Sequence, residues 1–382
     1  MTENKRIAYY APLKPPDHPI PSGDRQMARM LLAALNRAGY DAFLASRYIS
    51  YSKRHGAEIM AERKRGAIAE ADRLMAQWLG EGRFPDLWFC YHPYDKSPDW
   101  LGEEICARLA IPMITAEPCK TGQGPNGEWL PWRTEAQRAI VLADMNIVMT
   151  DSDRDYLAGF VPDERVTRLD PFIDTDLLVA EPVTDDPWPQ TTGCRLLTVG
   201  MMRPGAKLES YGVLASALAR LPRADWSLAI VGSGPAEEEI RRLFSGFADG
   251  RIVFAGERRP GEVLTLMERA DILAWPGCRE AYGMVYLEAA TRGTPAVALK
   301  NMGVPLVVSD GVSGLLADPP DAVQYAGALE RLITDQTLRK RLGEGARAFA
   351  LEARSGAMAA DRLRAIIEDV FSLREDRRGG ST

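Results

Sequence analysis

Residues 276–295 read PGCREAYGMVYLEAATRGTP, and they directly follow the apolar run Asp271–Trp275. The apolar run predicts a buried strand, and the Pro-Gly pair predicts a turn after it. A helix is expected over 282–292, so that Glu280 stands at its mouth and Glu288 lies on it. The segment therefore predicts a strand, a turn and a helix that together carry two carboxylates.

The spacing of these carboxylates favours ligand binding over paired acid–base chemistry. If both were helical, Glu280 and Glu288 would lie about 12 Å apart at 1.5 Å per residue. A retaining glycosidase that uses two carboxylates needs them roughly 5 Å apart. Gly283 lets a ligand approach the backbone, and a helix N-terminus favours an anion. The layout fits a sugar at Glu280, a phosphate at the amides of 283–285 and a ribose at Glu288. The simpler alternative is one surface glutamate and one helix charge.

Outward from this segment, short apolar runs alternate with helical periods. Strands are expected at Ile7–Ala11, Ala42–Ala45, Asp86–Tyr91, Ile111–Thr115, Asn146–Thr150, Leu196–Val199, Leu228–Val231, Ile252–Ala255, Ile272–Trp275 and Ala296–Leu299. Helices are expected over 27–38, 56–79, 208–220, 235–244, 261–269, 282–292 and within 321–373. Such alternation is typical of parallel sheets wrapped by helices.

The alternation of strands and helices is interrupted once, by a stretch rich in Pro, Thr and acidic residues. We interpret this stretch as a linker at 181–194. The predicted fold class is therefore α/β, with two doubly wound Rossmann-like domains facing a central cleft. The first domain is expected over 1–180 and the second over 195–354. Ligands of such sheets bind beyond the carboxyl ends of the strands, so the loops after strands are the places to search.

Composition narrows the class further. The 382 residues are 46% hydrophobic and 26% charged, with a net charge of -6, which argues against a general nucleic-acid binder. The five cysteines form no CxxC pair, and three histidines cannot build a His-rich metal site. The N-terminus lacks a signal-peptide pattern, and no apolar run approaches the ~20 residues of a membrane span. We therefore expect a cytoplasmic protein that could still sit peripherally at the inner face of a membrane.

Two further loops present phosphate-binding chemistry. Gly200-Met-Met-Arg203-Pro-Gly-Ala-Lys207 follows a predicted strand and offers two cations, which could neutralise a diphosphate without a metal. Binding that strengthens as the leaving phosphate gains charge accelerates the reaction. Gly232-Ser233-Gly234 opens the next helix, although a lone Gly-x-Gly is weak evidence for a phosphate loop.

The central segment resembles the Glu-x7-Glu motif of the GT4 family of retaining glycosyltransferases, which have the GT-B fold. Gly293-Thr-Pro-Ala-Val-Ala matches the strand entry of that family, and Ser309-Asp-Gly-Val-Ser-Gly-Leu-Leu-Ala-Asp-Pro matches its downstream turn. In the family the first Glu contacts the donor sugar and the second contacts the ribose. The resemblance covers most of 195–320, and the N-terminal half is similar mainly in architecture.

The resemblance implies a donor pocket. Lys207 is well placed against the family's Gly-Arg-Leu-x3-Lys-Gly element, whereas Met201 occupies the usual Arg position and Arg203 would substitute. In the family the Gly-x-Gly loop lines the diphosphate pocket, and the loop around Arg258 lies beside the base. The donor-binding residues expected from this resemblance are Gly23, Arg203, Lys207, Gly232, Ser233, Arg258, Glu280, Tyr282, Gly283, Met284, Val285 and Glu288. The final helix, 355–373, is expected to pack back on the first domain, as in relatives.

The acceptor side departs from the family. Many members carry a His after the strand at 111–115, near the reacting sugar, and this chain has Glu117. His92 follows another strand and could point the same way; a structural hydrogen-bonding role is the alternative. The candidate catalytic residues are Glu280, Lys207, Arg203, Glu117 and His92. Alternatively, the loop 120–132 covers the acceptor.

Two other features have simpler readings. Asp151-Ser152-Asp153 could suggest a metal-binding DxD motif, but it resembles the family's turn from strand to helix, with Asp151 or Ser152 as the helix cap. We therefore expect no metal and no cofactor. The basic residues Lys53, Arg54 and His55, with 63–65 behind them, could meet anionic lipid headgroups or form a solvated helix face.

The resemblance thus implies a metal-independent, retaining glycosyltransferase. It would move a sugar from a nucleotide-diphosphate sugar, of UDP or GDP type, to a hydroxyl of a glycan, lipid or small molecule. Two alternatives stay open. One is a nucleotide-sugar epimerase on the same fold. The other is a nucleotide-sugar-binding partner subunit with weak or no catalysis, which Glu117 and the displaced Arg motivate.

Overall fold

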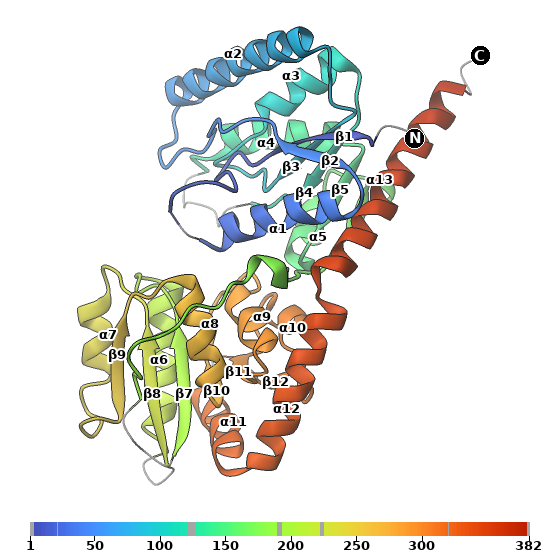
Figure 1. Ribbon diagram of the computed structural model, residues 1–382. Coiled ribbons are helices and arrows are strands. Elements are labelled where there is room, and N and C mark those ends of the chain that lie inside the picture. The colour runs from blue at the N-terminus through green and yellow to red at the C-terminus, as the bar shows by residue number, and fades with distance from the viewer. Residues whose placement is uncertain are drawn as a thin grey trace. The chain divides into compact units, whose positions relative to one another are not determined.

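Each half of the sequence builds one six-stranded sheet whose strands all run parallel. The computed structural model describes residues 4–20, 22–120, 127–188, 193–221, 225–319 and 321–379. Contacts divide the chain into a first unit, Met1–Asp170 with Gly356–Thr382, and a second unit, Pro171–Ser355 (Figure 1).

The first unit alternates strands and helices and closes with one helix from the far end of the chain. Its strands are β1 Arg6–Tyr10, β2 Asp41–Leu44, β3 Leu87–Tyr91, β4 Met113–Ala116, β5 Met145–Val148 and β6 Val166–Arg168. Its helices are α1 Gly23–Arg37, α2 Ala57–Glu81, α3 Trp100–Leu109, α4 Leu130–Leu142, α5 Asp151–Leu157 and α13 Gly356–Gly379.

The second unit has the same alternation. Its strands are β7 Cys194–Val199, β8 Trp226–Val231, β9 Ile252–Gly256, β10 Ile272–Ala274, β11 Ala296–Leu299 and β12 Gly314–Ala317. Its helices are α6 Ala206–Leu218, α7 Glu237–Leu243, α8 Pro260–Arg269, α9 Met284–Thr291, α10 Val304–Val307, α11 Ala322–Thr334 and α12 Gln336–Ala348.

The strand order places one topological switch point in each sheet. The first sheet has the strand order β2-β1-β3-β4-β5-β6, so the direction in which successive strands are added to the sheet reverses between β1 and β3. The second runs β12-β11-β10-β7-β8-β9 and reverses between β7 and β10. Ligands of open α/β sheets bind outside the carboxyl ends of the strands at this point. The loops after β7 and β10, and those after β1 and β3, are therefore the places to inspect.

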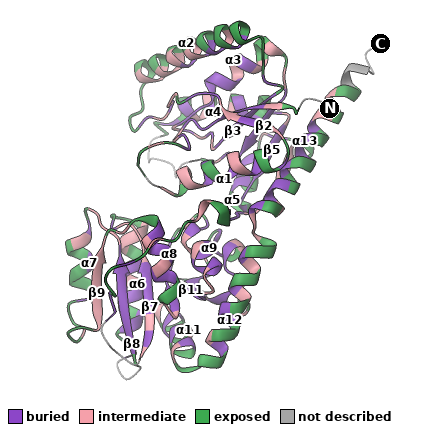
Figure 2. Cartoon of the chain, viewed as in Figure 1, coloured by how far each residue is buried: buried purple, intermediate pink, exposed green. Residues whose placement is uncertain are grey.

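Burial explains why the apolar runs form central strands. β3 and β8 are buried along their whole length, because helices cover both faces of a parallel sheet. In the second unit α6 packs with α7 and α11, whereas α9 packs with α8 and α12. Figure 2 shows the central strands buried and the outer faces of the helices exposed. Helices α1 and α8 are thus amphipathic, as their periodicity predicted.

The predicted elements lie at or within a few residues of the observed ones, with omissions. β6, β12, α3, α4 and α10 were not anticipated, and the helical region 321–373 is three α-helices separated at Asp335 and around 349–355. Within the first unit, α13 packs against α1.

The segment interpreted as a linker is held by the second unit in its described part, 181–188. The Glu181 amide donates to Gly261 O at 2.9 Å, and the Thr265 hydroxyl donates to Glu181 O at 2.6 Å. Trp188 donates its indole N–H to Leu196 O at 2.9 Å. The passage between units instead lies at Asp170/Pro171, before the boundary expected at residue 180.

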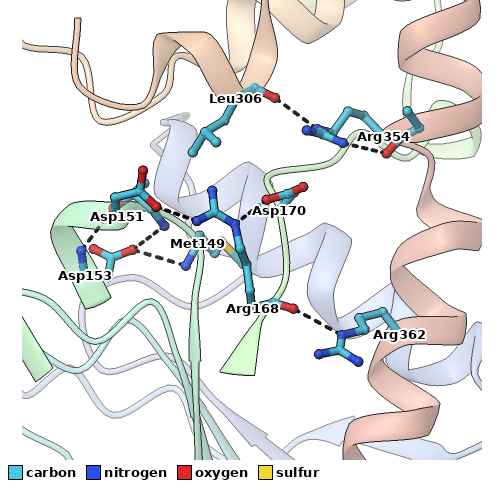
Figure 3. Close-up of polar contacts among 10 residues, drawn as sticks. Met149, Asp151, Asp153, Arg168, Asp170, Leu306, Arg354 and Arg362 are labelled. Atoms are coloured by element: carbon cyan, nitrogen blue, oxygen red, sulfur yellow. Dashed lines mark hydrogen bonds and ion pairs between the residues drawn. The ribbon is translucent and has the colours of Figure 1, made fainter. Parts of the chain in front are cut away.

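The chain leaves the first unit after Asp170 and re-enters it after Ser355. Figure 3 shows the arginines that fix these two points within their own units. Arg168 donates to Asp170 Oδ1 and Asp151 Oδ1, both at 2.6 Å. Arg354 donates from Nε to Leu306 O at 2.9 Å, and its carbonyl accepts from the Ile173 amide at 2.8 Å. Hydrogen bonds within one unit thus fix the chain next to each point at which it passes from one unit to the other.

Candidate functional site

A Lys–Glu ion pair occupies the switch point of the second sheet. Lys207 lies in the first turn of α6, after β7, and Glu280 lies in the turn between β10 and α9. The Lys207 ammonium pairs with Glu280 Oε1. Because Glu280 precedes α9 and does not lie on it, the helical spacing assumed for the two glutamates does not apply. Two predicted site residues that are 73 positions apart in the sequence are brought into contact.

Trp275 forms the floor beneath this pair. It follows β10 directly and is 0% exposed. Its indole Nε1 lies 3.3 Å from Glu280 Oε1, and Lys207 Nζ lies 5.2 Å from its ring centroid. The sequence predicted Trp275 only as the last residue of a buried strand. The available signal was a bulky aromatic residue placed directly before the Pro-Gly turn.

Arg203 does not join the pair. It lies in the loop between β7 and α6 and is exposed. Within the described part of the chain, its guanidinium has no recorded hydrogen bond or ion pair, whereas its backbone N–H donates to Met201 O at 3.1 Å. A solvated guanidinium on a short loop keeps its positive charge available to an anion.

The loops after β7, β8 and β9 interlock through glycine. Gly232 has φ +139°, and a Cβ there would lie 2.0 Å from Gly200 O. Its amide donates to Gly256 O at 2.8 Å. The adjacent Ser233 donates its hydroxyl to Glu257 Oε2 at 2.9 Å. Only glycine permits this backbone approach, so the Gly-x-Gly pattern has a structural reason besides any phosphate contact.

The start of α9 is shaped by glycine as well. Gly283 precedes the helix with φ +81°, and a Cβ there would lie 2.8 Å from Cε2 of Tyr286. Tyr282 and Met284 are buried, and Val285 is partly buried. The first amides of a helix have no intrahelical acceptor, so those at 284 and 285 can face a ligand anion.

Glu288 lies farther along α9 and is partly buried. Within the described residues no donor or cation is recorded for its carboxyl. Burial raises the pKa of this carboxyl to about 7. A carboxyl without a protein partner is able to accept hydrogen bonds from ligand hydroxyls.

Arg258 is engaged away from the loops that meet at the switch point. Its guanidinium makes a bidentate pair with Asp185, at 2.9 and 2.6 Å, and its Nε donates to Ala255 O. The guanidinium is thus occupied, and any role beside a base would fall to the backbone of this loop.

In the first unit, His92 and Glu117 follow the neighbouring strands β3 and β4. The His92 amide donates to Ala116 O, and the Glu117 amide donates to Ile147 O, both at 2.8 Å. Both residues are left-handed, with φ +61° and +53°, which is costly for residues with a Cβ. The structure thus brings the two predicted acceptor-side residues together.

The side chains of this pair are also close. His92 Nδ1 lies 3.6 Å from Glu117 Oε2, and His92 Nε2 lies 3.9 Å from the sulfur of Cys119. Burial alone would lower the pKa of the imidazole, but Cys119 and Glu117 together raise it well above 6.5. The raised pKa favours the imidazolium form of His92 beside Glu117.

The DxD-like segment is a helix start, with one correction. The cap of α5 is Thr150, not Asp151 or Ser152, and Asp153 completes a capping box by accepting from the Thr150 amide at 2.8 Å. Asp151 pairs with Arg168. Among the described side chains, no group of three or more His, Cys, Asp or Glu is placed to hold a metal ion.

The other predicted features lie in the first unit. Gly23 is the first residue of α1, which Ser22 caps. Of the basic cluster, His55 lies 3.2 Å from Glu128, and Lys64 lies 2.7 Å from Glu135. Of the loop 120–132, residues 121–126 lie outside the described residues. None of the helices that the structure describes has the length and apolarity needed to cross a membrane.

A known protein family matches part of the second unit. Residues 199–349 match the family model described as glycosyl transferases group 1. This stretch contains Arg203, Lys207, Glu280 and Glu288, so the match lies in the part of the chain that carries the donor-side candidates.

Two named relatives are similar to part of this chain. The D-inositol 3-phosphate glycosyltransferase of Corynebacterium diphtheriae is 34% identical over 165 residues, which cover 42% of this chain and 38% of that protein. The alpha-D-kanosaminyltransferase of Streptomyces kanamyceticus is 28% identical over 255 residues, 64% of each chain. The chain thus spans about two fifths of the length of the first of these relatives.

Solved structures show the fold. The sucrose-phosphate synthase of Thermosynechococcus elongatus superposes with a TM-score of 0.70 at 18% identity, over 97% of this chain and 100% of that chain. Anabaena HepE in complex with UDP-glucose gives 0.68 at 16% identity, over 95% and 99%. These likenesses confirm the predicted fold class, two Rossmann-like domains of the GT-B type. The match to glycosyl transferases group 1 and the named relatives support the predicted resemblance to GT4-like glycosyltransferases.

Proposed function

We propose that this protein is a retaining glycosyltransferase that moves a sugar from a nucleotide-diphosphate sugar, of UDP or GDP type, to an acceptor hydroxyl. The observation that carries the proposal is the meeting of Lys207 and Glu280 at the switch point of the second sheet. Both residues lie in the stretch that matches glycosyl transferases group 1. The solved HepE structure with UDP-glucose supports a donor of this chemical class.

On the donor side, Lys207 supplies the charge for the diphosphate. In the free protein Glu280 satisfies this ammonium; when a donor binds, its phosphates take over that role, with Arg203 as the second cation. Glu280 is then released to accept hydrogen bonds from sugar hydroxyls. A fixed cation beside the leaving phosphate stabilises the charge that develops as the sugar departs.

The ribose and the phosphates would meet α9. The unpartnered Glu288 carboxyl is proposed to accept from ribose hydroxyls, and the amides of 283–285 would face a phosphate at the helix N-terminus. Hydrogen bonds to the ionised carboxylate favour the charged form, so donor binding should lower the pKa of Glu288 from about 7.

On the acceptor side, Glu117 and His92 are proposed to orient the attacking hydroxyl. Glu117 accepts a hydrogen bond from the hydroxyl, and His92, whose Nδ1 lies 3.6 Å from Glu117 Oε2, orients this carboxyl group. The reaction requires no metal in this proposal. The acceptor is a glycan, a lipid or a small molecule.

A second candidate is a nucleotide-sugar-binding subunit with weak or no catalysis. Two observations favour it: Met201 occupies the position of the family's usual Arg, which is displaced to Arg203, and Glu117 stands where many family members carry His. This candidate predicts that donors bind but no sugar is transferred.

Thermal stabilisation by nucleotide sugars tests the donor pocket. At a ligand concentration of 100 Kd, a bound donor adds about 2.7 kcal/mol, a shift of a few degrees in Tm. We expect one nucleotide sugar to stabilise the wild type, and Lys207→Ala and Glu280→Ala to lose that gain. Glu237→Ala breaks an exposed ion pair on α7 of the same unit and serves as the matched control.

Transfer is then measured with the donor that binds, in cell extract as acceptor and with a chelator present. Transfer with retained anomeric configuration supports the enzyme, and binding without any transfer supports the second candidate. If no nucleotide or nucleotide sugar stabilises the wild type, the proposal is wrong.

A further inference from the structure

Trp275 contacts both members of the Lys207–Glu280 pair. Its indole N–H reaches Glu280 Oε1 at 3.3 Å, and its ring lies 5.2 Å from the Lys207 ammonium. The Glu280 carboxylate therefore has two hydrogen-bond donors, the indole N–H and the Lys207 ammonium. If the phosphates of a bound nucleotide sugar draw the ammonium away, the indole N–H still contacts the carboxylate. A cation near an aromatic face is attracted by the ring quadrupole. One side chain thus restrains the anion and the cation together.

Both the backbone and the ring of Trp275 are held by neighbouring residues. The Trp275 amide donates to Val297 O at 3.2 Å, and its carbonyl accepts from the Tyr286 hydroxyl at 2.9 Å. Tyr211 packs edge-on against the ring with centroids 5.2 Å apart. The side chain is 0% exposed. A buried indole with this many fixed neighbours is a rigid platform for the residues that it contacts.

The loop after β7 leaves space for this ring. A Cβ at Gly200 would lie 3.0 Å from Cη2 of Trp275, which is closer than side chains normally approach. Gly200 O accepts the hydroxyl of Tyr211 at 2.8 Å. The glycine that begins the Arg203–Lys207 loop is therefore matched to the tryptophan from β10.

We propose that Trp275 is a positioning residue that orients Glu280, and through its ring Lys207, for binding of the donor sugar. The proposal rests on the proposed function and adds to it a residue that touches no substrate. When phosphates draw Lys207 away, the indole N–H would keep Glu280 in the orientation needed for sugar hydroxyls. Discrimination between a nucleotide sugar and the free nucleotide should depend on this hydrogen bond.

Trp275→Phe tests the role, because phenylalanine retains an aromatic ring and removes the N–H. We expect affinity for UDP-glucose or GDP-mannose to fall about tenfold, as for a lost hydrogen bond to a charged group. Affinity for UDP or GDP should change less than twofold. In a Glu280→Gln background, Trp275→Phe should add little further loss. Equal losses for sugar nucleotide and nucleotide, or additive losses, would overturn the proposal.

Trp226→Phe is the matched control. Trp226 is a buried tryptophan at the start of β8, and its indole donates to Leu221 O at 3.1 Å, so this variant also loses a buried indole hydrogen bond. It should lower stability without changing the discrimination between sugar nucleotide and nucleotide. A matching loss of discrimination in Trp226→Phe would show that destabilisation alone explains the effect.

An NMR measurement without ligand tests the Trp275–Glu280 contact independently of the proposed function. The chain has eight tryptophans, and the indole N–H resonance that disappears in Trp275→Phe assigns Trp275. Glu280→Gln should move that resonance, whereas Glu237→Gln should not. If it moves but no nucleotide sugar binds, the proposed function fails and the contact stands. If donors bind and the resonance does not move, the positioning role fails alone.

Discussion

Glu288 is a carboxyl whose acidity is set by burial alone. Its pKa is raised to about 7 from an ordinary value of 4.5, with desolvation as the cause. The native state therefore holds a proton that the unfolded state releases between about pH 4.5 and 7. Stability must fall as the pH rises through this window and level off above it. The site thus keeps an acidic group that costs folding free energy at neutral pH.

Replacing Glu288 by Gln should remove this cost. We expect Glu288→Gln to gain about 1–3 kcal/mol of unfolding free energy relative to wild type at pH 8, and much less at pH 5. Urea denaturation at the two pH values measures the difference. Glu330→Gln, an exposed position of α11, is the control. A gain that is the same at both pH values would contradict the prediction.

His92 shows the opposite dependence. Its pKa is raised in the folded state, because Cys119 and Glu117 outweigh burial. The stabilisation is fully present below the unfolded pKa of about 6.5 and is lost as the pH rises through the folded pKa. His92→Gln should therefore lose about 1–2 kcal/mol more at pH 6 than at pH 10, measured by denaturant unfolding.

Glu117 determines whether this interpretation of His92 holds. In a Glu117→Gln background, the pH-dependent part of the His92→Gln effect should shrink, because the carboxylate that favours the imidazolium is gone. Asp153 also faces this cluster: burial, and then the Glu117 charge, raise its pKa to about 6, so Asp153→Asn is the companion control. An unchanged pH profile in the Glu117→Gln background would assign the effect to Cys119.

At the scale of elements, glycines decide how closely the loops approach. Gly232→Ala would place a Cβ 2.0 Å from Gly200 O at a φ of +139°. We expect it to cost about 2–4 kcal/mol of stability and to weaken nucleotide binding, since both loops must move. Gly246→Ala has no atom within 4 Å of its added Cβ and should be nearly neutral. Thermal unfolding with and without nucleotide checks both.

The elements that the sequence predicted are those in which the apolar pattern and the turn chemistry agree. The run before Pro276 and Gly277 predicted β10, and the helix after Gly283 followed from the same segment. β12 was missed because Gly314–Ala317 contains only two large apolar residues, and its pairing with β11 supplies what local pattern does not. β6 was missed for a similar reason, since Val166–Arg168 is short and polar.

The site was predicted in part. Motif spacing identified Lys207 and Glu280 but not their contact, because pairing across 73 residues depends on the order of strands. Trp275 was not identified, since a buried aromatic at the end of a strand is ordinary core until its neighbours are known. The left-handed backbone of His92 and Glu117 likewise has no local signature.

At the scale of the molecule, the first unit is discontinuous in sequence. α13 contributes Leu363, Ile366, Ile367 and Val370 to its core, each at most 2% exposed. Burying such side chains is worth about 1.5–3 kcal/mol each. Arg374 adds a two-bond contact to Asp144 at 2.9 Å. The first unit therefore depends on residues that follow the whole second unit.

Fragments should reflect this asymmetry. A chain of residues 171–355 should unfold cooperatively on its own, whereas residues 1–170 should not. Joining 1–170 to 356–382 through a short flexible linker should restore a cooperative transition, because Arg362 already bonds Arg168 O and Thr167 next to the first crossing. Calorimetry of the three proteins tests this expectation. Cooperative unfolding of 1–170 alone would show that α13 is dispensable.

The position of α13 also orders events during translation. The ribosome makes residues 1–170 first, yet the helix that completes their core emerges only after residue 356. At typical elongation rates the delay is on the order of ten to forty seconds. The second unit has all of its strands available earlier. The half of the chain that is synthesised first would thus be the last to mature, and in the meantime its uncovered α1 face is exposed to chaperones.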